Sequence, residues 1–122
     1  MHPPGWKPLA GLLATSGVLH LVRPQPFAAI VPRWLGDPGP WVRLSGLAEI
    51  GCAAGLAAPR WRERTAVATA ALLVAVYPAN VQMAVTALRS SRATRGYRAL
   101  TVARLPLQVP LVRWAWRLRR PA

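Results

Sequence analysis

Six polar side chains stand inside otherwise apolar stretches of the sequence, and their types could bind a ligand or move protons. Glu49, one of only three acidic residues in the chain, lies about 12 Å beyond Trp41 along a helix that rises about 1.5 Å per residue. Asn80 lies at a similar depth measured from Leu88. Residues that share a depth on four helices can surround one site. The predicted pocket residues are His20, Ser45, Glu49, Asn80, Arg104 and Gln108.

Glu49 is expected to face the interior of the bundle and to pair with Arg104, because an intramembrane charge needs a partner. In a binding site, His20 and Glu49 would relay protons, while the other polar groups would bind a carbonyl or an anionic head group. Structural alternatives stay open. The Glu49–Arg104 pair could serve stability alone, His20 could be a simple interfacial histidine, and Asn80 could satisfy a carbonyl freed by a kink at Pro78. Whether Glu49 is ionised stays open too.

The cysteine count restricts the chemistry further. The single Cys52 excludes an internal disulfide, a Cys-x-x-Cys redox pair and a multi-cysteine metal site, and we interpret it as a packing residue. The sequence predicts no metal site and no intrinsic cofactor. Electron chemistry would therefore require a bound quinone or lipid, or a partner protein.

Four apolar segments could position these residues. The hydropathy pattern predicts an all-α fold, a four-helix transmembrane bundle that forms one integral membrane domain over residues 1–122. Residues 27–35 are apolar but too short to cross a bilayer, so we expect a short interfacial segment between the first two helices. Only the third segment, which Pro78 should kink, is secure on hydropathy alone. The predicted spans are about 8–22, 41–58, 65–88 and 99–118.

The helix faces suggest how the bundle packs. Ser45, Glu49 and Cys52 share one stripe of a helix. Gly51 and Gly55 form a Gly-x-x-x-Gly pair that would let a neighbouring backbone come close. We therefore expect a close helix contact at these two glycines.

Composition favours a membrane protein. Hydrophobic residues make up 53% of the chain and charged residues 16%, with a net charge of +13, which is too apolar for a disordered chain. Most arginines fall between the apolar segments, as at the ends of membrane helices, so we expect no nucleic-acid binding. Tryptophans near the segment ends indicate an aromatic belt. Seven Lys or Arg residues fall on each predicted side, so orientation is undetermined. For the first apolar segment, a signal peptide is the alternative to a membrane helix.

Several short motifs follow one another in a distinctive order. They are Gly17-Val18-Leu19-His20, Arg23-Pro24 with Pro32-Arg33-Trp34-Leu35, Ser45-Gly46 with Glu49-Ile50, the Arg-rich turn after Pro59, Tyr77-Pro78-Ala79-Asn80, and Arg104 with Gln108. With this ordered set, residues 11–118 resemble the DoxX-like family of small bacterial integral membrane proteins. The resemblance implies a multi-pass four-helix bundle in the bacterial cytoplasmic (inner) membrane. It also implies a link to membrane redox systems, which in some family members include quinone-linked thiosulfate oxidation.

These observations together predict a small non-catalytic subunit, or a lipid- or quinone-binding module, of a membrane redox system. The expected partners are membrane lipid, a redox partner protein and further copies of the chain. Two alternatives remain: a structural or assembly partner without ligand chemistry, and a conductor of small solutes or protons. The sequence predicts no catalytic residue, and enzymatic activity stays open.

Overall fold

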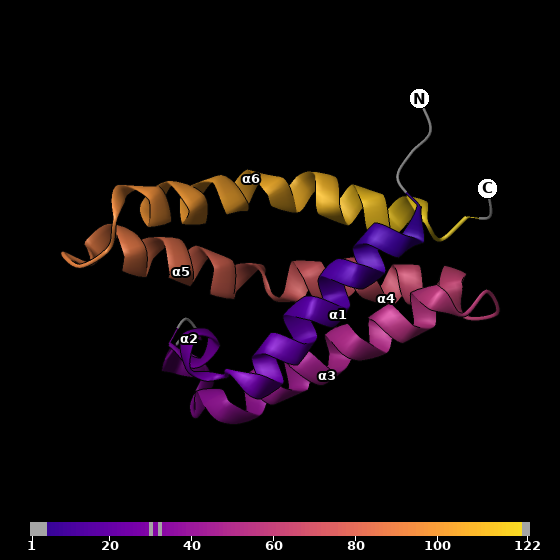
Figure 1. Ribbon diagram of the computed structural model, residues 1–122, viewed down its shortest axis with the longest axis horizontal. Coiled ribbons are helices and arrows are strands. Elements are labelled where there is room, and N and C mark those ends of the chain that lie inside the picture. The colour runs from indigo at the N-terminus through magenta and orange to yellow at the C-terminus, as the bar shows by residue number, and fades with distance from the viewer. Residues whose placement is uncertain (1–4, 30, 32, 121–122) are drawn as a thin grey trace.

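The protein is all-α. The computed structural model describes residues 5–29, 31 and 33–120, and these contain no strand. Two short elements, α2 (Gln25–Ala28) and the 3-10 helix η1 (Arg33–Leu35), connect the first two long helices. The long helices are α1 (Trp6–Val22), α3 (Pro38–Ala57), α4 (Arg62–Ala75) continued after Val76 by α5 (Tyr77–Arg89), and α6 (Arg95–Arg117) (Figure 1).

The expectation of four long helices is confirmed, with α4 and α5 counted as one interrupted rod. The interruption falls at Val76, two residues before Pro78, whose missing N–H breaks the helical ladder. Side-chain caps fix two helix starts: Asp37 accepts a hydrogen bond from the Gly39 N–H at 3.0 Å, and Thr94 accepts one from the Tyr97 N–H at 3.1 Å. The expected interfacial segment, residues 27–35, contains η1 and overlaps the end of α2, while Ile30 and Pro32 lie outside the described residues.

The helices are arranged as two packed pairs. α1 runs antiparallel along α3, and the α4–α5 rod runs antiparallel along α6, while α3 also packs on α4 (Figure 1). The pairs converge where α1 begins, where α3 turns into α4 and where α6 ends. They diverge toward the opposite end, where α2 and η1 lie (Figure 1).

A hydrophobic core fills the converging end. Leu56 and Ala115 are fully buried there, and many of the remaining core residues are alanines, whose small size lets the helices approach closely. Arg62 ties the α3–α4 turn to this core, since its Nε donates to the Leu56 carbonyl at 2.7 Å. The core residues are Leu9, Ala10, Leu13, Cys52, Ala53, Leu56, Ala66, Ala70, Leu73 and Ala115.

The closest contact between α1 and α3 lies at Gly17 and Gly46. A Cβ on Gly17 would stand 2.7 Å from the Gly46 carbonyl oxygen, and one on Gly46 would stand 3.0 Å from the Gly17 carbonyl oxygen. The prediction of a close approach at Gly51 and Gly55 was wrong for Gly51, which meets nothing within 4 Å, whereas Gly55 faces the Thr65 side chain of α4. Both glycines of the predicted pair lie on α3, but α1 crosses α3 at a different face.

Length and hydropathy single out one rod. Within the described part of the chain, the rod Arg62–Arg89, with 28 residues, is long and apolar enough to cross a membrane, and little of it is buried.

Candidate site between the diverging helix pairs

A cavity of about 850 Å³ occupies the space between the diverging pairs. Its inner end reaches core residues such as Leu9 and Leu73, while Trp34, from the segment that joins α1 and α3, and Trp41, in the first turn of α3, line it as well. Trp41 also fixes that segment, because its indole Nε1 donates to the Leu35 carbonyl at 2.9 Å. Most of the lining is apolar. Five of the six predicted pocket residues line it: His20, Ser45, Glu49, Asn80 and Arg104.

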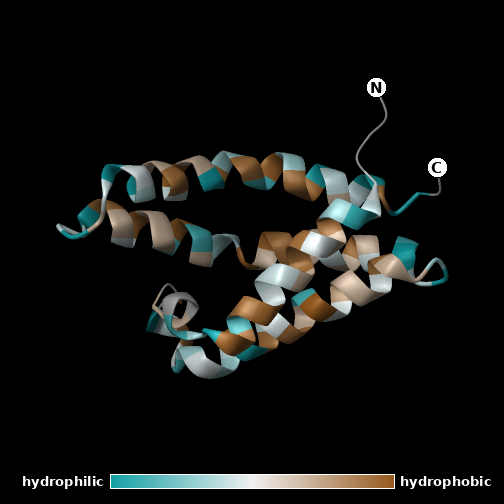
Figure 2. Cartoon of the chain, viewed as in Figure 1, coloured by the Kyte–Doolittle hydropathy of each residue, from teal (hydrophilic) through white to brown (hydrophobic). Residues whose placement is uncertain are grey.

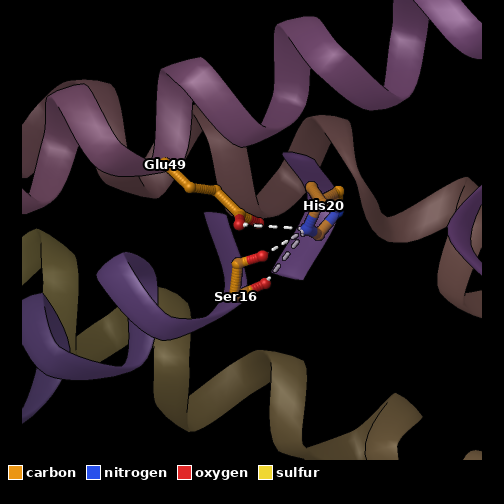
Figure 3. A network of polar contacts seen from close by, with 3 residues as sticks. All are labelled: Ser16, His20 and Glu49. Atoms are coloured by element: carbon orange, nitrogen blue, oxygen red, sulfur yellow. Dashed lines mark hydrogen bonds and ion pairs between the residues drawn. The ribbon is translucent and has the colours of Figure 1, made fainter. Parts of the chain in front are cut away.

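The wall formed by α1 and α3 carries a linked group of Ser16, His20 and Glu49 (Figure 3). The Gly17–Gly46 crossing holds these residues together, because Gly17 neighbours Ser16 on α1 and Gly46 lies one turn before Glu49 on α3. The His20 Nδ1–H donates to the Ser16 carbonyl at 2.6 Å, and His20 Nδ1 lies 3.5 Å from Glu49 Oε2 (Figure 3). Glu49 is only 8% exposed. Glu49 Oε2 is buried without a hydrogen-bond partner among the described residues, so this carboxyl oxygen can still accept a hydrogen bond.

The opposite wall carries Asn80 on α5 and Arg104 on α6. Asn80 Nδ2 is buried without a hydrogen-bond partner. Arg104 is half-buried, and its Nη1 donates to Gln108 Oε1 at 3.4 Å. The two walls therefore differ: one presents a carboxyl group beside an imidazole, and the other presents a guanidinium and an amide whose Nδ2 lacks a partner.

The predicted ion pair between Glu49 and Arg104 was wrong. Glu49 lies beside His20, and no salt bridge joins Glu49 to Arg104 among the described residues. The physical reason is lateral position. Shared depth brings residues to one level, but α3 packs on α1, which places the His20 imidazole beside Glu49, whereas α6 packs on α4 and α5.

Gln108 does not line the cavity. It is buried on α6, and its Nε2 donates to the Leu73 carbonyl in the last turn of α4. Carbonyls in a last helical turn lack helical partners, so Gln108 satisfies the backbone at the interruption. The sequence offered this role to Asn80 as an alternative, and the structure gives it to Gln108.

Two further polar residues line the cavity. Ser16 stands one helical turn before His20, and this i, i+4 spacing was the signal that could have added it to the predicted set. Thr101 also lines the cavity, but its hydroxyl donates to the Arg98 carbonyl at 2.9 Å. Cys52 packs in the core, away from the cavity lining. In the described residues no group of three or more His, Cys, Asp or Glu side chains is placed to hold a metal ion.

Comparison with known families decides the affiliation. The sequence model of a domain of unknown function, DUF8561, matches residues 9–119. The chain belongs to the DUF8561 family. The match covers the whole stretch on which the DoxX-like resemblance rested, and that resemblance was wrong. No curated protein and no solved structure matches this DUF8561 chain.

Proposed function

We propose that this DUF8561 protein is a multi-pass integral membrane protein whose cavity binds an amphipathic membrane lipid. The exterior of the molecule supports the membrane part. Large apolar side chains are exposed on every long helix, among them Val22 on α1 at 69%, Leu44 on α3 at 60% and Leu100 on α6 at 66%. An apolar surface that extends around a whole bundle is rare in proteins surrounded by water.

Helix dimensions and polarity support the same proposal. α1 and α3, with 17 and 20 residues, measure about 26 and 30 Å, close to the roughly 30 Å of a bilayer core. Hydrophilic residues gather at the α3–α4 turn and the α5–α6 turn, although α6 carries them along its length as well (Figure 2). At the converging end the Arg62 guanidinium lies 4.8 Å from the centre of the Trp6 ring. Tryptophan and arginine together are typical of a membrane–water interface.

The cavity supports the lipid part. Its volume of about 850 Å³ lies within the range of about 300–1,000 Å³ common for small-molecule sites. The apolar lining suits a hydrocarbon or isoprenoid chain, and the polar residues of both walls suit a head group. A quinone and a phospholipid both have this amphipathic form. If the bound lipid is a quinone, the protein would belong to a membrane redox system and would have a partner protein in the bacterial cytoplasmic membrane.

The single observation that carries the proposal is an apolar cavity with polar groups inside a bundle that is also apolar outside. Its test has two steps. First, the expressed protein should stay with the membrane fraction after alkaline carbonate washing and should need detergent for extraction. Second, mass spectrometry of the purified protein should find a retained lipid. Protein released by carbonate, or protein without retained lipid, would contradict the proposal.

A structural or assembly role is the second candidate function. It is favoured by the Gly17–Gly46 crossing and the His20–Glu49 contact, which hold α1 on α3 without any ligand. In that case His20→Gln and Glu49→Gln should lower stability in detergent while the lipid content of the purified protein stays the same. Loss of a specific retained lipid in either variant would favour the binding function instead.

A further inference from the structure

The charge distribution leaves one cavity arginine without a carboxylate. The chain has three acidic residues. Asp37 caps α3, Glu63 is exposed in the first turn of α4, and Glu49 lies beside His20. Arg104 forms no salt bridge among the described residues, and its one hydrogen bond to a side chain, to Gln108, is long at 3.4 Å. Its guanidinium is half-buried in the wall of an apolar cavity. A cation in such surroundings needs an anion, and no acidic residue of this chain supplies it.

Asn80 adds a second unsatisfied donor at the same level of the bundle. Two contacts set the register of α6 against the α4–α5 rod: Arg98 Nε donates to the Ala87 carbonyl at 3.2 Å, and Gln108 donates to the Leu73 carbonyl. On α6, Arg104 lies between Arg98 and Gln108. On the α4–α5 rod, Asn80 lies between Leu73 and Ala87, the residues that those two contact. Both side chains line the cavity, and Asn80 Nδ2 is buried without a partner.

The geometry points to an anion-binding site at Arg104 and Asn80, which selects lipids whose head group carries a phosphate or carboxylate. This inference rests on the proposed lipid binding and names the class of lipid. Guanidinium and amide N–H groups bind such oxygens through charge-assisted hydrogen bonds. Glu49 Oε2, on the opposite wall, is buried without a hydrogen-bond partner and can accept a hydrogen bond from a head-group hydroxyl.

A lipid fits the site better than free phosphate does. Most of the cavity lining is apolar, with Leu100 on the same helix as Arg104 and with Leu12 and Leu44 on the α1–α3 wall, and these contacts would add binding only for a ligand that carries a hydrocarbon chain. A neutral quinone could accept hydrogen bonds from the same donors, but it would leave the charge of Arg104 uncompensated.

The test measures lipid selectivity. The full chain is reconstituted in nanodiscs of phosphatidylcholine with 5% phosphatidylglycerol, then extracted in mild detergent, and the retained lipids are quantified by native mass spectrometry. We expect phosphatidylglycerol to be enriched over its share of the bilayer. Arg104→Gln should reduce the enrichment about ten-fold or more, as expected for loss of a charge-assisted hydrogen bond, and Arg104→Lys should keep part of it. Arg113→Gln, an exposed site on the same helix, is the matched control and should change nothing.

Asn80→Asp keeps the assay informative if Arg104→Gln fails to fold. The new carboxylate would neutralise Arg104 from within the chain, so the variant should fold and lose the enrichment. Inorganic phosphate at millimolar concentration should leave the enrichment unchanged, and displacement of lipid by phosphate would identify the free anion as the ligand.

The two proposals fail in different ways. Retention of phosphatidylcholine or quinone without preference for the anionic lipid, or full enrichment in Arg104→Gln or Asn80→Asp, would overturn the anion site and leave lipid binding intact. Absence of any retained lipid in the unaltered protein would overturn lipid binding itself.

Discussion

The converging end of the molecule and the diverging end are built from different residues. At the converging end, small side chains such as Ala66 and Ala115 are fully buried, and the four rods enclose a dry core. At the diverging end, a cavity of about 850 Å³ separates the pairs, and the buried polar side chains of Glu49 and Thr101 line it. The difference suggests that the converging end stabilises the fold and that the diverging end binds a ligand.

The largest expected effect comes from deleting the same side chain at each end of α3. Leu56 is fully buried at the converging end, whereas Leu44 lines the cavity and is 60% exposed. Leu56→Ala should lower the free energy of unfolding by about 2–5 kcal/mol, because the packed core cannot collapse around the void. Leu44→Ala should change it by less than about 0.5 kcal/mol. Equilibrium unfolding in mixed detergent measures both, and equal losses would contradict the comparison.

The next effect concerns the crossing that connects the two ends. Gly17→Ala places a methyl group 2.7 Å from the Gly46 carbonyl oxygen, so α1 must move away from α3, at a cost of about 1–3 kcal/mol. Gly51→Ala is the matched control, since its new methyl group meets nothing within 4 Å. It should be neutral or stabilise by up to about 1 kcal/mol, the helix preference for alanine over glycine. If Gly51→Ala lowered the stability more than Gly17→Ala does, the result would support the close helix contact at Gly51 and Gly55 that the sequence predicted.

These glycines show which parts of the fold a sequence can specify. Pro78 correctly predicted the interruption of the third rod, because a missing N–H acts locally. The choice between Gly17 with Gly46 and Gly51 with Gly55 depends on which helix faces meet, and spacing within one helix does not contain that information. Short motifs in order along four apolar helices likewise suggested a family to which the chain does not belong.

The candidate site shows the same limit. Helical rise placed Glu49 and Asn80 at a similar depth and His20 and Arg104 in the same half of the bundle, and the structure finds all four in the lining of one cavity. Depth could not decide that Glu49 meets His20, because that depends on the lateral order of the helices. It also could not separate Asn80, whose amide nitrogen has no partner, from Gln108, which bonds to the α4 backbone.

A smaller effect tests this assignment of Gln108. Gln108→Leu should leave the Leu73 carbonyl buried without a donor and cost about 1–3 kcal/mol of stability, while lipid retention stays unchanged because Gln108 lies outside the cavity lining. Gln82→Leu is the control, since Gln82 bonds only to Thr86 at an exposed position of α5. A Gln108→Leu protein that unfolds normally but loses its lipid would place Gln108 in the binding site after all.

The smallest expected effect is a coupling energy, and it tests which partner Glu49 has. A double-mutant cycle of His20→Gln and Glu49→Gln should give a coupling of about 1 kcal/mol, as is typical of charged or hydrogen-bonded side chains in contact. The matching cycle of Glu49→Gln and Arg104→Gln should give no more than about 0.5 kcal/mol, as for residues without a shared contact.

Both cycles are measured on lipid-free protein, because a bound anion would connect the two walls. If lipid is then added, coupling between Glu49 and Arg104 should rise, since the head group lies between a carboxylate and a guanidinium that do not touch. Strong coupling between Glu49 and Arg104 without lipid would mean that the walls close on each other in the empty protein. The cavity would then be a property of the ligand-bound state, and the diverging end would be as tightly packed as the converging one.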